Sequence, residues 1–198
     1  MSNILRSTAV LLSFLWILNS FAGDPTAVTG RPRIPLSGKW RSQMLADPAA
    51  APGAAWQDAN LPGDFTFPDG VDALWLEREV EVPASFAGRR VALHVGGLYY
   101  GLAVYVGEQC MGEIPAWGGD ADLTAQIKPG AVNRIRLLFP RLGKGLMLDA
   151  VTAAAVEMME KHQGPRLGLL GYYNMAGINC LPEQFYLESQ PNEVMITD

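Results

Sequence analysis

The chain has 198 residues, of which 49% are hydrophobic and 18% charged, and this composition excludes a disordered chain or a coiled coil. Its 15 lysines and arginines are outnumbered by 20 aspartates and glutamates, and no stretch concentrates the basic residues. Because binding to nucleic acid depends on a basic surface, nucleic acid is not an expected partner. The length predicts one folded domain with a sizeable core.

The first predicted element is an export signal. Arg6 precedes an apolar run over residues 9–18, and the small residues Ser20 and Ala22 follow it. This order is typical of a secretory signal peptide at 1–22, and the run falls short of the roughly 20 residues that span a bilayer. We expect cleavage after Ala22 and a mature protein that is periplasmic or extracellular, without stable membrane insertion.

Residues 23–35 are predicted to form a linker, because they contain three prolines, two glycines and no apolar period. A domain is predicted to follow over residues 36–198. Within it, residues 45–55 are expected to be a second irregular stretch.

Strands dominate the remainder of the predicted domain. Residues 90–95, 102–106 and 134–139 alternate apolar and other side chains with the period of two expected for a strand with one buried face. Glycine-containing turns at 96–97, 107–109 and 128–130 separate these segments. The predicted inward-facing residues are Val91, Leu93, Val95, Leu102, Val104, Val106, Ile135, Leu137 and Phe139.

These short strands with regular turns predict an all-β, antiparallel two-sheet sandwich. One short helix is expected at 152–162, where strong helix formers lie between Thr152 and Gly164. A long loop is expected over 163–180, followed by a final strand that begins at Phe185.

The two cysteines, Cys110 and Cys180, leave two alternatives open. An oxidising compartment allows them to form a disulfide if their Cα atoms lie within about 7 Å. We favour the other alternative, in which each is a small buried hydrophobic residue.

No catalytic motif is present in the sequence. It lacks a nucleophile elbow, a zinc-protease helix, a Cys-x-x-Cys pair and both nucleotide-binding glycine loops. His94 and His162 are interpreted as structural. The spacing of the aspartates fixes no pair of carboxylates for glycoside hydrolysis, and no calcium site can be assembled from it. We therefore assign no catalytic residue, no metal and no cofactor.

A series of motifs in a fixed order is more informative. The series is Leu36–Trp40, Trp56 before Leu61–Gly63, Leu74–Arg78 leading into Val80–Pro83, Gly88–Gly97, Ala103–Gly107, Met111–Glu113, Ala121–Thr124, Ile127–Gly130 and Asn133–Leu137. Over about residues 36–190 it resembles the N-terminal sugar-binding domain of glycoside hydrolase family 2, the family of β-galactosidases, β-glucuronidases and β-mannosidases.

The resemblance implies a galactose-binding-like jelly roll, and it places the catalytic glutamates in a separate barrel domain beyond Asp198. Two positions depart from the family pattern. Gly107 stands where the family usually has Asn in a turn, which preserves the turn because glycine accepts positive φ. Gly177-Ile178 is followed by Asn179-Cys180 and not by an aromatic residue and an arginine, so its alignment stays open.

Three functions are compatible with this resemblance. The leading hypothesis is a non-catalytic, carbohydrate-associated accessory domain of an exported glycosidase, whose partner is the catalytic domain and which completes its substrate cleft. The second is an independent carbohydrate-binding module, and the third is an accessory domain of an exported esterase or other hydrolase. The reading frame after Asp198 discriminates among them. A barrel sequence with two catalytic glutamates supports the first hypothesis, a stop codon supports the second, and a Ser-His hydrolase supports the third.

Aromatic residues are the candidates for a carbohydrate or partner rim. Trp40, Trp56 and Trp75 are predicted to be core. Trp117 lies between a proline and two glycines, where its ring can remain exposed. The functional edge is predicted to be made by residues 112–120 and 163–180, and the candidate rim residues are Trp117, Tyr172, Tyr173, Asn174, Tyr99 and Tyr100. The alternative is that these rings cap the ends of the sandwich.

Overall fold

The computed structural model describes residues 31–141 and 175–191. The chain divides into two units, Met1–Pro32 and Arg33–Asp198, and all strands described below belong to the second. The predicted signal peptide at 1–22 and the expected helix at 152–162 lie outside the described residues. Within the described ranges, no helix is long and apolar enough to cross a bilayer.

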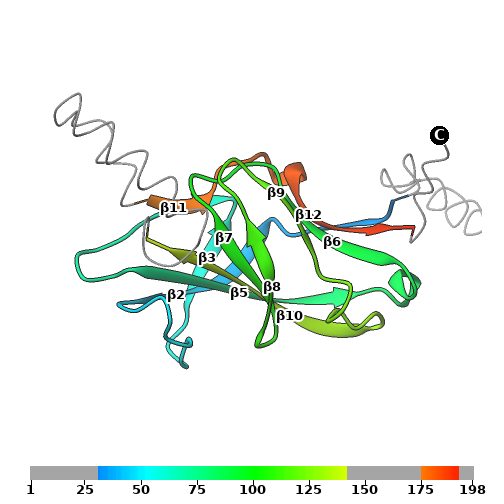
Figure 1. Cartoon of the computed structure of the whole chain (residues 1–198), viewed down its shortest axis with the longest axis horizontal. Coiled ribbons are helices and arrows are strands. Elements are labelled where there is room, and N and C mark those ends of the chain that lie inside the picture. Colours follow the sequence, from blue (N-terminus) through cyan, green and yellow to red (C-terminus); the bar gives the residue numbers. More distant parts are fainter. Residues whose placement is uncertain (1–30, 142–174, 192–198) are drawn as a thin grey trace, which may run out of the picture. The chain divides into compact units, whose positions relative to one another are not determined.

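The larger sheet has six antiparallel strands (Figure 1). Their spatial order is β3 (Gln57–Leu61), β2 (Gly38–Leu45), β5 (Ala73–Val82), β10 (Ala131–Pro140), β7 (Leu102–Val106) and β8 (Gln109–Ile114). β5 and β10 pair along their whole lengths in the middle of the sheet. A β-bulge interrupts the pairing of β7 with β8 between Val104 and Tyr105.

The smaller sheet has four antiparallel strands, in the order β1 (Arg33–Pro35), β12 (Phe185–Gln190), β6 (Arg90–Val95) and β9 (Gly119–Asp122). A two-stranded ladder joins β4 (Gly63–Thr66) to β11 (Met175–Ile178), and short 3₁₀ turns occur at Ala84–Phe86 and Pro182–Gln184. The predicted linker at 23–35 is therefore three residues too long, because Arg33, Ile34 and Pro35 pair with β12.

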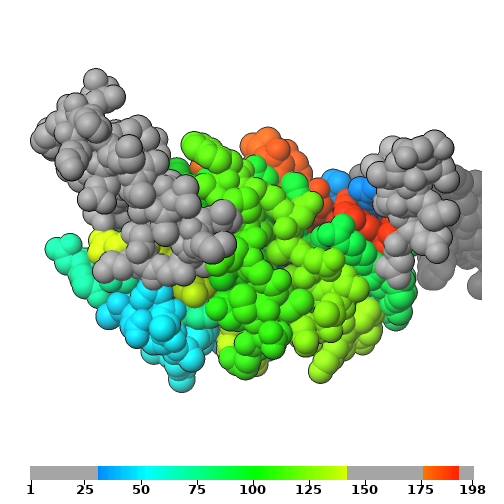
Figure 2. All heavy atoms as spheres, in the orientation of Figure 1, coloured from blue at the N-terminus to red at the C-terminus, as the bar shows by residue number. Residues whose placement is uncertain are grey.

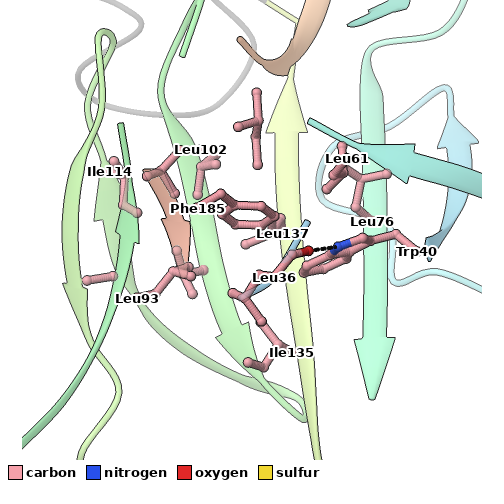
Figure 3. Close-up of a cluster of buried hydrophobic side chains, with 14 of the residues drawn as sticks. Leu36, Trp40, Leu61, Leu76, Leu93, Leu102, Ile114, Ile135, Leu137 and Phe185 are labelled. Carbon is pink, nitrogen blue, oxygen red and sulfur yellow. Dashed lines mark hydrogen bonds between the residues drawn. The ribbon is translucent and has the colours of Figure 1, made fainter. Parts of the chain in front are cut away.

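The main hydrophobic core takes residues from both sheets (Figure 3). Leu93 of β6 and Phe185 of β12 come from the smaller sheet and lie against Leu137 of β10 and its neighbours. The Trp40 ring stacks on Phe185 with centroids 5.6 Å apart, and its indole N–H donates to the Leu36 carbonyl oxygen over 2.7 Å. Trp40 thus buries a large apolar area without leaving its donor unpaired.

The predicted alternation is confirmed on the inward faces. All nine residues assigned to those faces are buried: Val91, Leu93, Val95, Leu102, Val104, Val106, Ile135, Leu137 and Phe139. The antiparallel sandwich predicted from the sequence is confirmed as well. Its jelly-roll topology remains a prediction.

A second, smaller apolar cluster forms around Trp75 of the larger sheet. Ala73, Trp75, Ala103 and Leu138 are buried in it. Leu45, Trp56 and Tyr105 pack against it half-buried, and the Trp75 and Tyr105 ring centroids are 5.0 Å apart. The prediction that Trp40 and Trp75 are core is confirmed, and Trp56 contributes to packing with part of its ring in solvent.

Cys110 and Cys180 do not form a disulfide. Cys180 is half-buried and packs against the main core. The expectation of a buried residue is wrong for Cys110, which is exposed. It lies on β8, an edge strand of the larger sheet, opposite Tyr105.

Candidate functional site

The structure describes part of the two segments that were predicted to form a functional edge. β8 ends at Ile114 and β9 begins at Gly119, so the loop expected at 112–120 is reduced to residues 115–118. The segment expected to be a loop at 163–180 contains strand β11, which pairs with β4. Its residues 163–174 lie outside the described residues. The first loop is therefore shorter than predicted, and the described end of the second segment is partly strand, because strand pairing uses these residues.

The ends of these two segments meet at the turn after β6. The Trp117 N–H donates to the Leu98 carbonyl oxygen, and the Asn179 N–H donates to the Gly97 carbonyl oxygen, each over 3.2 Å. Leu98 also forms an isolated β-bridge with Ile178. In Figure 1 the connections around β7 and β9 lie beside the segment after β11, and in Figure 2 green and orange atoms gather at the same upper edge. Backbone hydrogen bonds thus attach both residues 115–118 and residues 175–180 to the same turn at Gly97 and Leu98.

Trp117 is the most exposed large hydrophobic residue of this edge. Its side chain is 84% exposed, and its backbone φ is +77°. A bulky residue with positive φ is a conformational outlier that costs about 1–3 kcal/mol, and such outliers concentrate at functional sites. The loop therefore presents an indole ring to solvent from a strained backbone held by its neighbours.

The backbone around Trp117 is tightly enclosed. The Gly118 N–H donates to the Pro115 carbonyl oxygen over 3.2 Å. The Gly118 Cα lies so close to the chain that an added Cβ would stand 2.3 Å from the Val95 carbonyl oxygen. No residue with a side chain fits there without displacement, so Gly118 fixes the path of the loop and the direction of Trp117.

Of the other predicted rim residues, three lie outside the described residues, one is half-buried and one is buried. Tyr172, Tyr173 and Asn174 lie outside the described residues. Tyr99 is half-buried, whereas Tyr100 is only 9% exposed and cannot offer an open ring face. Leu181, which sequence reasoning missed, is 60% exposed on the segment that follows β11. Its only signal was Pro182, which favours an extended conformation at the preceding residue.

His94 belongs to a paired surface cluster on the smaller sheet. Its Nδ1 lies 2.6 Å from an Asp120 carboxylate oxygen, and its ring stacks on Tyr186 with centroids 4.7 Å apart. The Arg33 guanidinium lies 4.1 Å from the centre of the Tyr186 ring. These contacts agree with the structural role predicted for His94. Among the described residues, no group of three or more His, Cys, Asp or Glu side chains is arranged to hold a metal ion.

A charged network occupies the outward face of the larger sheet. Glu77 is 2% exposed and accepts hydrogen bonds from Arg41 and, over 2.6 Å, from Arg136 Nε. Arg136 also donates to Glu108 over 2.7 Å. Burial alone lowers the pKa of Arg136, but the hydrogen bonds and charges of Glu77 and Glu108 outweigh it and raise that pKa. Glu77 and Glu108 therefore hold Arg136 firmly in the charged state.

Comparisons with known proteins give one kind of match. No family model and no curated protein matches the chain. Among solved structures it is similar to a Ruminococcus gnavus β-glucuronidase in complex with D-glucaro-d-lactam, with 21% identity and a TM-score of 0.49 over 56% of this chain and 22% of that one. The same enzyme in complex with uronic deoxynojirimycin gives 22% identity and a TM-score of 0.48 over 56% and 22% of the two chains.

The chain thus spans about a fifth of the length of those enzymes. A likeness at this level does not assign it to their family. Their catalytic activity and their ligands are properties of those proteins.

Proposed function

We propose that this chain is a non-catalytic, carbohydrate-associated accessory domain of an exported glycosidase, which completes one wall of the substrate cleft of a separate catalytic domain. The observation that carries the proposal is Trp117, an exposed indole held at positive φ where residues 115–118 and 175–180 meet. The order of motifs along residues 36–137 supports the link to a glycosidase.

The chemistry of an exposed indole suits a sugar. The apolar face of a pyranose ring packs against an aromatic ring, and a rigidly held ring loses little conformational entropy on binding. Such stacking contributes about 1 kcal/mol beyond buried area, so the lone domain binds monosaccharides in about the millimolar range. A weak contact of this kind is useful next to a catalytic cleft, where it adds to other contacts with the same glycan.

An independent carbohydrate-binding module is the second candidate. The same exposed ring serves this function without a catalytic partner, and it is the only observation that favours it. Binding of free oligosaccharide by the lone chain at micromolar Kd supports the module. Binding that becomes appreciable only when the catalytic domain is joined supports the accessory domain.

Replacement of Trp117 tests the site. We expect Trp117→Ala to weaken glycan binding about five- to tenfold, because it removes the stacking surface. The free energy of unfolding should change by less than about 0.5 kcal/mol, because the ring is exposed. Trp117→Gly should lose binding equally but unfold at an equal or higher temperature, since glycine adopts positive φ without strain. Calorimetric titration and thermal unfolding measure the two effects.

Val132→Ala is the matched control for Trp117, since Val132 is also a large exposed apolar residue, 62% exposed at the start of β10. It should change neither binding nor stability. A sharp fall of the melting temperature in Trp117→Ala with unchanged binding would show that the ring is structural and that the rim is elsewhere.

The lone chain is expected to hydrolyse no glycoside. Hydrolysis needs a proton donor and a nucleophile or base on opposite sides of one bond, and the resemblance puts both outside this chain. Release of nitrophenol from galactosides, glucuronides and mannosides measures the activity. Turnover that survives repurification and disappears when a residue within 23–198 is replaced contradicts the accessory role.

A further inference from the structure

A cleft opens where strands β2 and β5 stop pairing. The two strands pair only where Arg41–Leu45 lie opposite Ala73–Glu77. Toward Gly38, β2 pairs with β3 alone, and toward Val82, β5 pairs with β10 alone. The strands therefore form a fork beyond the Arg41–Glu77 position, and their facing backbone edges no longer share a ladder. A cleft of about 470 Å³ is lined by residues of this fork, a size within the range of small-molecule sites.

The cleft is charged but carries no net charge. Its lining includes three cationic and three anionic side chains: Lys39, Arg41, Arg78, Asp58, Glu77 and Glu79. A site for phosphate or for a divalent cation concentrates one sign of charge, and this lining does not. The cleft instead offers both donors and acceptors.

Part of the lining is fixed by the fold. Arg78 reaches across the fork and donates to the carbonyl oxygens of Leu36 and Ser37 over 2.7 and 3.1 Å. Burial lowers the pKa of Arg78. Arg41 and Glu77 are held by their mutual ion pair. These groups form a preorganised wall, which reduces the entropy cost of binding a ligand.

Two charged side chains of the cleft are unengaged. Lys39 and Asp58 are exposed, and neither side chain makes an ion pair or a hydrogen bond with another residue in the described ranges. They supply a cationic donor and an anionic acceptor on neighbouring strands, since Asp58 is the cross-strand partner of Arg41. Hydrogen bonds from such charged groups are about twice as strong as neutral ones.

Two unpaired polar atoms lie on the same two strands, outside the cleft. Gln43 and Trp75 are direct cross-strand partners, two positions from Arg41 and Glu77. The Gln43 Oε1 and Trp75 Nε1 atoms are buried and have no hydrogen-bond partner within the described part of the chain. Both residues lie in the paired part of β2 and β5, on the side of Arg41 and Glu77 away from the fork, and neither lines the cleft, so they do not contribute to the site.

We propose that the fork between β2 and β5 binds a neutral, polyhydroxylated ligand of the size of a pyranose, with Asp58 accepting from its hydroxyls and Lys39 donating to them. A hydroxyl both donates and accepts, so it matches a lining that carries both signs of charge without bringing a charge of its own. The ligand class follows from the cleft's own charges and does not depend on the function proposed for the Trp117 rim.

Backbone amide NMR shifts of the purified chain test the proposal. The probes are methyl β-D-galactopyranoside, methyl β-D-glucopyranoside and methyl α-D-mannopyranoside, with sodium phosphate and magnesium chloride as charged competitors. We expect at least one pyranoside to shift residues 38–41, 57–59 and 77–79. Lys39→Ala and Asp58→Ala should each weaken that binding by about tenfold, while Lys128→Ala and Glu81→Ala, exposed controls outside the cleft, leave it unchanged.

Three results overturn the proposal. The first is that no pyranoside shifts the cleft residues, and the second is that neither Lys39→Ala nor Asp58→Ala weakens the binding. The third is a larger response of the cleft to phosphate or magnesium than to the pyranosides. Trp117→Ala separates this site from the rim: shifts at 96–99 and 115–118 that vanish in this variant report the rim, and cleft shifts that persist report the fork.

Discussion

Glu77→Gln is expected to lower the free energy of unfolding by about 3 kcal/mol, because it removes the charge of the buried partner in an ion-pair network. Glu77 is buried and accepts from Arg41 and Arg136, and Arg134 lies 3.8 Å away. Glutamine keeps the size of the side chain but removes its negative charge. Arg136, whose side chain is only 9% exposed, is then left with exposed Glu108 as its remaining ion-pair partner.

Glu79→Gln is the matched control, because Glu79 lies on the same strand and face but is 59% exposed and pairs with Arg134 at 3.7 Å. An exposed pair of this kind contributes less than about 1 kcal/mol. Denaturant unfolding compares the two variants. If Glu77→Gln costs no more than Glu79→Gln, the buried charge is not needed to hold the arginines. Replacing both Glu77 and Arg136 by methionine should cost less than Glu77→Gln alone, because no buried charge is left unpaired: the partners that lose their contacts, Arg41 and Glu108, are exposed.

The network also shapes the surface next to it. Asp58, Arg41, Glu77, Arg136 and Tyr105 are successive cross-strand partners on β3, β2, β5, β10 and β7. Opposite charges at adjacent positions stabilise the register of the pairing. Glu77 and its cross-strand partner Arg41 form the last pair of the β2–β5 ladder, after which β2 diverges from β5. Glu77 therefore lies at the closed end of the fork, where it also lines the cleft.

The strands of the two sheets could be predicted from the sequence where their inward residues alternate. In β6, Val91, Leu93 and Val95 are separated by Ala92 and His94, and the turn at residues 96–97 marks the end of the strand. One buried face is enough to impose this period, because a shift by one residue would expose all three side chains. The core therefore follows from local sequence.

Strands β1 and β11 are among those that could not be predicted, because their sequences carry no such period. β1 consists of Arg33, Ile34 and Pro35, and its proline and short length are typical of a linker. β11, which contains Gly177, was expected to be loop. Both exist through pairing with distant partners, β12 and β4, and such nonlocal contacts leave no local signature.

The candidate sites were predictable to different degrees. The exposure of Trp117 was predicted from the proline and glycines around it. Its positive φ and the meeting of its loop with Leu98 depend on tertiary hydrogen bonds, which no pattern reports. The cleft at the fork was not predictable, because it arises from where β2 leaves β5. Glu77 occupies an outward strand position that the period of two assigns to solvent, although it is buried.

Gly118→Ala is expected to destabilise the chain by at least about 3 kcal/mol, the sum of a positive-φ penalty and a backbone collision. Gly118 has φ +110°, and an added Cβ would lie 2.3 Å from the Val95 carbonyl oxygen and 2.9 Å from the Gly96 carbonyl carbon. Both contacts are with backbone, so no side-chain rotation relieves them. Thermal unfolding should show a fall of about 6–12 °C.

Gly107→Ala is the matched control, because Gly107 also has positive φ, at +60°, but an added Cβ there meets nothing within 4 Å. It should cost only about 1 kcal/mol, the conformational penalty alone. Equal losses of stability in the two variants would show that the close approach to Val95 is not important.

The two variants should also differ in glycan binding, because the collision in Gly118→Ala pushes residues 115–118 away from the turn after β6. Gly118→Ala should therefore weaken glycan binding at Trp117 at temperatures where the domain is still folded, whereas Gly107→Ala should not.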